Sequence, residues 1–256
     1  MVNYMDFQLT GKTALITGSS SGLGNIMAEG LAQQGVHVLL NGRNERKLQA
    51  SVAEFHEKGY KATPFAFDVT NASDIAQNAR RIHNEVGPLD ILVNNAGVQR
   101  RHPLEDFPEE AFDEVITTNL KAAYLVSKAF VKPMIAQKAG KIVNICSLQS
   151  TLGRATITPY AASKGGLKMM TRGMATEWAG YNIQVNAIGP GYFKTEMTRA
   201  LYEDGEFDRW LCQRTPANRW GNPEELIGTL LYLSSGASSF VNGQIIYVDG
   251  GITACI

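Results

Sequence analysis

Ser147, Tyr160 and Lys164 are three side chains in this sequence that could together move a proton to and from a substrate. If Tyr160 opens a helix, Lys164 lies one turn further along the same face, with Cβ atoms about 5–6 Å apart. A free tyrosine, with a pKa of about 10, is a poor base at neutral pH, but a nearby ammonium lowers that pKa. Ser147 ends a strand-like run and could hold a substrate oxygen. By itself, a tyrosine one turn before a lysine is more often an ordinary pair on a helix surface.

The element that would bring a cofactor to these residues is a glycine-rich turn near the start of the chain. Lys12 to Thr17 predicts a short buried strand, Gly18 to Gly24 (GSSSGLG) a turn, and Ile26 to Gln34 a helix. Glycines also occur in simple turns, but a strand before the turn and a helix after it favour a dinucleotide site. Free backbone N–H groups and the positive end of the helix dipole favour a pyrophosphate there.

The end of the second predicted strand, residues 36–41, indicates which dinucleotide binds. A carboxylate at this point would bind the ribose hydroxyl of NAD, whereas an arginine accommodates the 2′-phosphate of NADP. The sequence has Asn41, Gly42 and Arg43 instead of an acid. We therefore expect NADP, with NAD accepted at lower preference. The alternative is that Arg43 is a solvated loop charge.

Strand and helix patterns alternate through the rest of the chain. Further strands are predicted at residues 62–67, 89–93, 141–147, 183–188 and 244–248. Further helices are predicted at residues 44–58, 72–86, 112–138, 159–179 and 223–234. We expect one α/β domain over residues 1–256, a Rossmann-type doubly wound parallel sheet of about seven strands with helices on both faces. Residues 196–216 look irregular, and we expect a mobile substrate lid around residues 193–218.

Overall composition excludes several classes of partner. Lys plus Arg and Asp plus Glu each number 24, so no basic excess indicates nucleic acid or an anionic membrane surface. No apolar run approaches the ~18 residues of a membrane span, and the start lacks a secretory pattern, so we expect a cytoplasmic protein. Cys146, Cys212 and Cys255 have no metal-ligand spacing, and we expect reduced thiols and no metal site.

Taken together, the motifs resemble the short-chain dehydrogenase/reductase family. In order along the chain they are Thr17 with the glycine turn, Asn94 to Gly97 (NNAG), Asn119, Ser147, Tyr160 with Lys164, and Pro190-Gly191. Their order and spacing match this family over essentially Leu9 to Gly251. The resemblance implies a Rossmann-type fold and hydride transfer between a nicotinamide cofactor and a substrate.

The resemblance also implies a role for individual residues. The catalytic residues would be Asn119, Ser147, Tyr160 and Lys164. The cofactor would contact Gly18, Ser20, Ser21, Gly22, Leu23, Gly24, Arg43, Asp68, Val69, Asn95, Ala96, Gly97, Tyr160, Lys164, Pro190, Gly191, Phe193 and Thr195. Asn119 would hold a water that links Lys164 to solvent. From its own position, an asparagine inside a predicted helix indicates a kink or a bound water, and Asp68 could equally cap a turn.

Four stretches narrow the resemblance to members that interconvert D-gluconate and 5-dehydro-D-gluconate. They are residues 94–103, 144–154, 189–198 and 210–221. A sugar acid needs donors for its carboxylate and hydroxyls. The candidate substrate residues are Arg101, His102, Ser147, Gln149, Arg154 and Tyr160. Arg100 and Arg101 could instead be surface charges or contacts between subunits.

Other functions share most of these features. Another short-chain reductase, such as a 3-oxoacyl-(acyl carrier protein) reductase or a polyol or sugar dehydrogenase, would have the same catalytic residues. A non-catalytic NADP-binding regulator is disfavoured because such proteins usually lose the tyrosine or the lysine, and both are present. Members of the family are commonly tetramers, so we expect a homotetramer.

Overall fold

The computed structural model describes residues 7–255 and contains one parallel sheet of seven strands. The strand order is β3-β2-β1-β4-β5-β6-β7. The strands are β1 (Thr13–Ile16), β2 (His37–Gly42), β3 (Ala62–Ala66), β4 (Ile91–Asn94), β5 (Gly140–Ile145), β6 (Ile183–Pro190) and β7 (Ile245–Val248). The doubly wound parallel sheet predicted from the sequence is confirmed.

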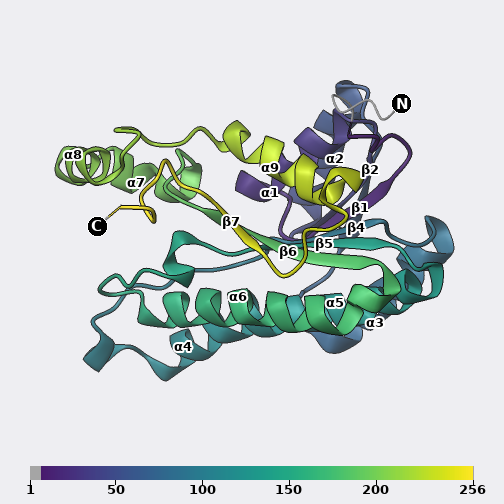
Figure 1. Cartoon of the computed structure of the whole chain (residues 1–256), viewed down its shortest axis with the longest axis horizontal. Helices are drawn as coiled ribbons and strands as arrows, with labels where there is room; N and C mark the ends of the chain where they lie inside the picture. Colours follow the sequence, from purple (N-terminus) through teal and green to yellow (C-terminus); the bar gives the residue numbers. More distant parts are fainter. Residues whose placement is uncertain (1–6, 256) are drawn as a thin grey trace.

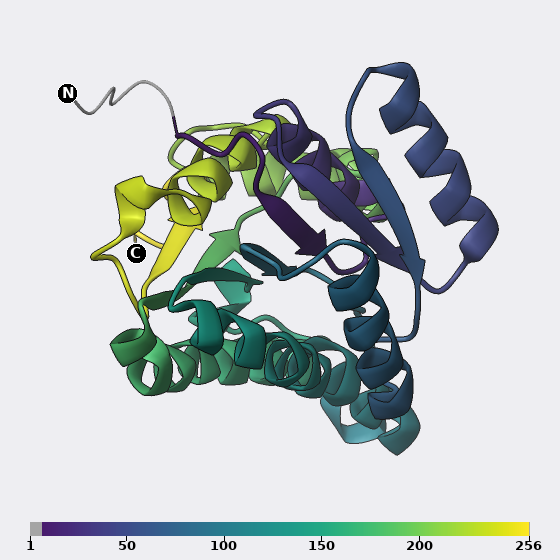
Figure 2. The ribbon, with the colours of Figure 1, turned by 90° about the vertical axis from the view of Figure 1, so that its right-hand side faces the viewer.

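Helices cover both faces of this sheet (Figure 1). One layer contains α1 (Gly22–Ala32), α2 (Glu45–Glu57) and α9 (Ile227–Ser234). The opposite layer contains α3 (Ala72–Glu85), α5 (Ala122–Gln137) and α6 (Thr158–Trp178), with α4 (Glu109–Ile116) beside α6. The view along the sheet shows both layers (Figure 2). Within residues 7–255, no helix combines the length and the apolar composition needed to cross a lipid bilayer.

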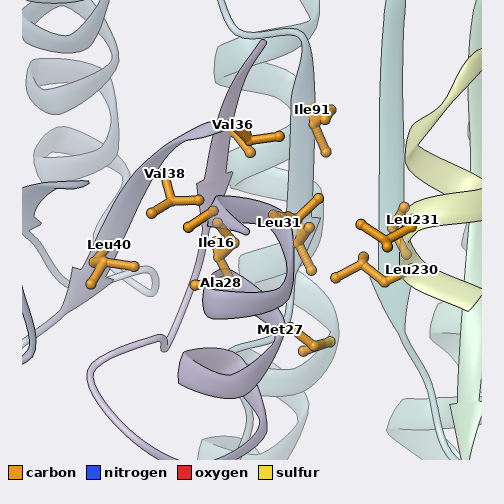
Figure 3. Packing of buried hydrophobic residues seen from close by; sticks show 14 of the residues in the cluster. Ile16, Met27, Ala28, Leu31, Val36, Val38, Leu40, Ile91, Leu230 and Leu231 are labelled. Carbon is orange, nitrogen blue, oxygen red and sulfur yellow. The ribbon is translucent and has the colours of Figure 1, made fainter. Parts of the chain in front are cut away.

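The core beneath α1 fixes the position of the glycine turn that precedes this helix. Met27, Ala28 and Leu31 of α1 are buried in one cluster with Ile16 of β1 and Leu230 of α9 (Figure 3). Burial of these apolar side chains stabilises the folded state by about 25 cal/mol for each Å² of surface removed from water. Since α1 is held against both the sheet and α9, its first turn is a rigid element at the carboxyl end of β1.

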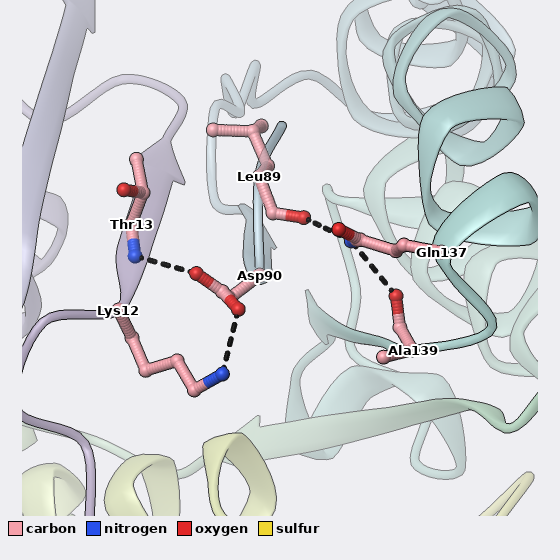
Figure 4. A network of polar contacts seen from close by, with 6 residues as sticks. All are labelled: Lys12, Thr13, Leu89, Asp90, Gln137 and Ala139. Atoms are coloured by element: carbon pink, nitrogen blue, oxygen red, sulfur yellow. Dashed lines mark hydrogen bonds and ion pairs between the residues drawn. The ribbon is translucent and has the colours of Figure 1, made fainter. Parts of the chain in front are cut away.

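A polar network ties the opposite, amino-terminal edge of the sheet together (Figure 4). Asp90, just before β4, accepts hydrogen bonds from the Lys12 ammonium at 2.8 Å and from the Thr13 N–H at 2.9 Å. Gln137 donates to the carbonyls of Leu89 and Ala139, both at 3.0 Å. The network lies away from the carboxyl ends of the strands, where a doubly wound sheet binds ligands.

The long helix predicted over residues 112–138 differs from the structure. It is divided into α4, a π-helical turn at Thr117–Lys121, and α5. Asn119 is buried inside this turn. A π turn inserts an extra residue and is a frequent feature of functional sites. The local irregularity expected at Asn119 is therefore a π turn, which hydrophobic periodicity alone does not reveal.

Residues 196–216, expected to be irregular, contain a short 3-10 helix at Glu196–Thr198 and two α-helices. The two α-helices are α7 (Arg199–Tyr202) and α8 (Gly205–Arg214). Asp204 caps α8, because its side chain accepts hydrogen bonds from the N–H groups of Glu206 and Phe207. Leu211 of α8 is fully buried against Trp220 and Ile252. The segment thus has its own small core, whose packing partners are distant in sequence.

Candidate active site

A cleft of about 990 Å³ lies along the carboxyl ends of the strands. Loops that follow β1 to β6 line it, and the strand order reverses between β1 and β4 at its centre. Ligands of doubly wound sheets bind at this reversal. The cleft brings together all the predicted cofactor residues and every predicted catalytic residue except Asn119.

The glycine turn between β1 and α1 is shaped for close approach of a ligand. Gly18 and Gly22 have φ values of +63° and +61°, which favour glycine. A Cβ on Gly24 would lie 2.4 Å from the Gly18 carbonyl oxygen and 2.5 Å from Nδ2 of Asn95. Ser21, the residue before α1, makes no side-chain cap, so the first N–H groups of the helix are not occupied by it. Such N–H groups bind phosphate oxygens.

Thr17 and Asn95 hold this turn against the loop after β4. The Thr17 hydroxyl accepts hydrogen bonds from the N–H groups of Asn95 at 3.0 Å and Ala96 at 3.1 Å. Asn95 donates in return to the carbonyls of Thr17 at 2.9 Å and Gly18 at 3.1 Å. Asn95, Ala96 and Gly97 line the cleft, so this pairing fixes two of its walls relative to one another.

At the end of β2, two cations face the cleft without an acidic partner. Arg43 and Lys47 line the cleft, and no described carboxylate forms an ion pair with either. The Asn41 side chain is fully engaged, since it accepts from the Gly18 N–H and donates to the carbonyls of Phe65 and Phe67. Lys47, which lies in the first turn of α2, was not among the residues predicted from the sequence, although a second cation so soon after Arg43 was a usable signal.

Asp68, after β3, lines the cleft and also shapes a turn. Its Oδ1 accepts hydrogen bonds from the N–H and the hydroxyl of Thr70, both at 2.8 Å. The turn-capping alternative considered for Asp68 therefore describes its contacts. Val69 lines the cleft beside it.

Ser147, Tyr160 and Lys164 meet at the cleft as their spacing predicts. The Ser147 hydroxyl accepts a hydrogen bond from the Gln149 N–H at 3.2 Å. Lys164 Nζ donates to the Ile145 carbonyl at 2.7 Å and lies 5.7 Å from the centre of the Tyr160 ring. The Ser147 hydroxyl also hydrogen-bonds the Tyr160 side chain, so the two hydroxyls meet at one point of the cleft.

Burial controls the protonation of this group. It lowers the pKa of Lys164, whose side chain is 4% exposed, to about 8. Burial also raises the pKa of Tyr160 above its ordinary value, and hydrogen bonding to Ser147 opposes this only in part. The one-turn spacing of Tyr160 and Lys164 in the sequence predicts that the ammonium lowers the pKa of Tyr160. In the protein alone the desolvation of the phenolate is the larger effect.

Asn119 lies behind the cleft wall and makes no part of its lining. Its Oδ1 accepts from the Val98 N–H at 2.7 Å, and its Nδ2 donates to the Val98 carbonyl at 2.9 Å and to the Ser163 hydroxyl at 3.1 Å. Both amide hydrogens are therefore used. A Cβ on Gly97 would lie 3.2 Å from Asn119 Oδ1 and 3.7 Å from Lys164 Nζ, so only a glycine separates the two side chains.

Two of the predicted substrate residues, Arg101 and Arg154, place their guanidinium groups in the cleft wall. Arg154 donates to the Tyr192 hydroxyl at 2.7 Å, and its guanidinium lies 4.8 Å from the centre of the Phe207 ring. Burial and the charge of Arg154 both lower the pKa of Arg101. Neither arginine forms an ion pair with a described carboxylate. Tyr192, which sequence reasoning did not assign to the substrate, orients Arg154.

Two other sequence candidates lie elsewhere. His102 is exposed, packs edge-on against Phe107 with ring centres 5.3 Å apart, and is not part of the cleft lining. Arg100 forms an ion pair with Glu114 at 2.7 Å on the surface. The alternative that Arg100 is a surface charge matches its contacts.

The loop after β6 closes the remaining side of the cleft. Pro190, Gly191, Phe193 and Thr195 all line it, as predicted for cofactor contacts. A Cβ on Gly191 would lie 2.7 Å from Cα of Asp249, so the loop packs tightly on the segment after β7. Glycine is required here by close packing of the two backbones.

Comparison with known proteins relates this cleft to enzymes of one family. The short chain dehydrogenase family matches residues 12–206. The 5-keto-D-gluconate 5-reductase of Escherichia coli (strain K12) is 52% identical over 250 residues, 98% of each chain. The 2-dehydro-3-deoxy-D-gluconate 5-dehydrogenase of Formosa agariphila is 48% identical over 98% of this chain and 96% of that protein.

A solved structure of a relative has the same fold as this chain. The gluconate 5-dehydrogenase from Burkholderia cenocepacia J2315, crystallised in complex with NADP and tartrate, superposes with a TM-score of 0.96. It is 47% identical, and the match covers 98% of each chain.

Proposed function

Because the chain belongs to the short-chain dehydrogenase family, we propose that it is an NADP-dependent enzyme that interconverts D-gluconate and 5-dehydro-D-gluconate. The observation that carries this proposal is the pair of guanidinium groups, Arg101 and Arg154, in the same cleft as Tyr160. Two cations without a carboxylate partner favour an anionic substrate. The relative from Escherichia coli, which is 52% identical, bears a name with the same reaction.

The residues of the cleft fit NADP. At Gly22, the first residue of α1, a Cβ would meet no atom within 4 Å, so space for a pyrophosphate lies over the start of this helix. Arg43 and Lys47 would hold the 2′-phosphate, and a solved relative contains NADP. Bound NADP supplies the atom that accepts or returns the hydride. NAD, which lacks the phosphate, would bind with lower preference.

The proton is handled by the chain itself. In oxidation Tyr160 takes the hydroxyl proton at C5 of gluconate, and in reduction it returns a proton to the C5 oxygen. Ser147 donates its hydrogen bond to that oxygen. Lys164, held by the Ile145 carbonyl, places a positive charge beside the phenol and favours its ionised form. Asn119 keeps the loop at Val98 in place and supports a path for the proton toward water.

A second candidate reaction comes from the relative in Formosa agariphila, whose name gives a 2-dehydro-3-deoxy-D-gluconate 5-dehydrogenase. The position of oxidation is again C5, and the substrate is again a sugar acid. Arg101 and Arg154 would serve either acid. The choice between the two depends on contacts at C2 and C3.

A substrate panel tests the proposal. The absorbance of the reduced nicotinamide would be followed with NADP or NAD against D-gluconate, other aldonates, 2-dehydro-3-deoxy-D-gluconate, polyols and a 3-oxoacyl thioester. We expect the highest kcat/KM for D-gluconate or its 5-keto product with the NADP couple. Activity confined to the thioester or to uncharged polyols would contradict the assignment of the two arginines.

We also propose that the enzyme works as a homotetramer in the cytoplasm. The helical layer that contains α3, α5 and α6, called here the outer helical layer, exposes large apolar side chains, including Tyr124 on α5 and Met169 on α6. Apolar groups gathered on the surface of a helix layer favour contacts between subunits.

A further inference from the structure

Gln149 is a buried polar side chain whose contacts within the protein are incomplete. It lines the cleft, is 7% exposed, and belongs to the short helix at Leu148–Ser150. Its Oε1 is shielded from solvent and has no hydrogen-bond partner within residues 7–255. Buried polar groups are nearly always paired, so an unpaired amide in a ligand cleft indicates a partner supplied by the ligand.

The backbone places this amide beside the reacting centre. The Gln149 N–H donates to the Ser147 hydroxyl at 3.2 Å, while Ser150 Oγ accepts from the Ser147 N–H at 3.3 Å. This reciprocal cap fixes the residues around Ser147 as one rigid unit. Because Ser147 and Gln149 are two residues apart in this unit and line the same cleft, a substrate whose reacting oxygen is bound by Ser147 would have its adjacent carbons near Gln149.

We propose that the Gln149 amide hydrogen-bonds a hydroxyl on the carbon next to the reacting carbon. The enzyme would thereby select vicinal diols and α-hydroxy ketones over the corresponding deoxy compounds. This inference rests on the proposed function, because it takes the reacting oxygen to lie at Ser147. In gluconate oxidised at C5, the neighbouring hydroxyls are those on C4 and C6. Nε2 can donate to either hydroxyl, and the shielded Oε1 can accept from either once the side chain turns toward the ligand.

The test compares two substrates in two forms of the enzyme. The ratio of kcat/KM for D-gluconate to that for 4-deoxy- or 6-deoxy-D-gluconate would be measured in the wild type and in Gln149→Met. We expect one of the two ratios to be roughly 10 to 100 in the wild type, and to fall to about 1 in the variant. The deoxy acid should be turned over about equally well by both proteins. An unchanged ratio in Gln149→Met would overturn the inference.

Gln77→Met is the matched control, because Gln77 is exposed on α3 and lies outside the cleft. It should retain the wild-type ratio. Removing an unpaired buried oxygen relieves a cost, so Gln149→Met should melt at or above the wild-type temperature. A lower melting temperature with equal losses for all three acids would show a purely structural role and overturn the inference. Failure of the wild type to oxidise gluconate would instead reject the proposed function and this inference together.

Discussion

At the scale of single residues, Tyr160 is the group on which proton transfer depends in the proposed reaction. Replacing it with phenylalanine removes only the hydroxyl and leaves the ring that packs in the cleft. We expect Tyr160→Phe to lose about 10²- to 10⁴-fold in kcat, because that is the usual contribution of a positioned acid or base. NADP affinity, measured by fluorescence titration, should stay near the wild-type value.

Tyr181→Phe is the control for this substitution. Tyr181 lies after the far end of α6, is 43% exposed, and does not line the cleft. Its variant should keep wild-type turnover. Near wild-type kcat in Tyr160→Phe would remove the tyrosine from the mechanism.

The protonation of Tyr160 predicts different pH profiles for the two directions. Since burial raises the pKa of Tyr160 above its ordinary value, the phenol is neutral at pH 7 and ready to donate a proton in reduction. Oxidation needs the phenolate, whose small population grows about tenfold per pH unit below the pKa. We expect kcat/KM for reduction to be flat between about pH 6 and 7, below the Lys164 pKa of about 8, and kcat/KM for oxidation to rise over that range. An oxidation profile that is flat from pH 6 upward would mean that the bound complex already holds the phenolate.

Arg43 and Lys47 are the residues expected to distinguish NADP from NAD. A charge-assisted hydrogen bond to phosphate contributes about 1.5–3 kcal/mol, which is roughly 10- to 100-fold in affinity. We expect Arg43→Asp to lower kcat/KM with NADP and raise the relative use of NAD, and Lys47→Ala to lower it with NADP alone. Arg46→Ala is the control, because Arg46 is exposed on the same helix but outside the cleft. An unchanged preference in Arg43→Asp would exclude Arg43 as the selector.

Residue types and spacing predicted most of this site, for a physical reason. The strand-turn-helix pattern before Gly24 and the one-turn spacing of Tyr160 and Lys164 are local, so the sequence contains them directly. The pKa of Tyr160 could not be predicted this way, because desolvation depends on every element that surrounds the phenol. The placement of His102 outside the cleft likewise depends on its packing against Phe107.

At the scale of elements, the glycine turn and α1 form one rigid unit that tolerates no side chain at Gly24. A Cβ there would lie 2.4 Å from the Gly18 carbonyl oxygen, so the turn would have to open. We expect Gly24→Ala to destabilise the fold by about 1–3 kcal/mol and to weaken NADP binding at least ~10-fold. Both effects follow from displacement of the same N–H groups.

Gly228→Ala is a control with the opposite expected effect. Gly228 lies within α9, in the helical layer away from the proposed subunit contact, is exposed, and has open space where a Cβ would lie. Alanine in a helix interior is favoured by about 0.5–1 kcal/mol over glycine, so this variant should melt higher. Chemical denaturation of both variants gives the two free energies of unfolding. Equal, small effects would show that the turn accommodates a side chain at Gly24.

Element boundaries show where sequence reasoning ends. The seven strands are short, mostly apolar runs, of which the five inner ones are almost wholly buried, and their pattern was sufficient to find each of them. The π turn at Thr117–Lys121 was not predicted, because Asn119 is held there by Val98 and Ser163, neither of which is near in sequence. Similarly, α8 is stabilised by Leu211 packing on Trp220, and its own composition is largely polar.

At the scale of the whole molecule, the exposed apolar groups on the outer helical layer are the feature that the single chain leaves unexplained. Met169 of α6 is 65% exposed and Tyr124 of α5 is 45% exposed. The chain has a formal net charge of zero at pH 7, so long-range repulsion does not oppose association of several copies. Both helices also carry or flank the catalytic side chains, and contacts between subunits on this layer would hold Tyr160 and Lys164 in place.

We therefore expect the wild type to sediment as a tetramer at micromolar concentration, and Tyr124→Asp with Met169→Asp to sediment as a smaller species. Burying a carboxylate without a partner costs several kcal/mol at each copy of the contact, more than a subunit interface of ordinary strength can lose. Gln49→Asp with Ala53→Asp is the control, since it adds the same two charges at exposed positions of α2, in the opposite helical layer (Figure 1). Sedimentation velocity and kcat would be measured on the same samples, because loss of subunit contacts should lower turnover along with mass. A doubly substituted protein that keeps the wild-type mass would place the subunit contacts on another face of the molecule.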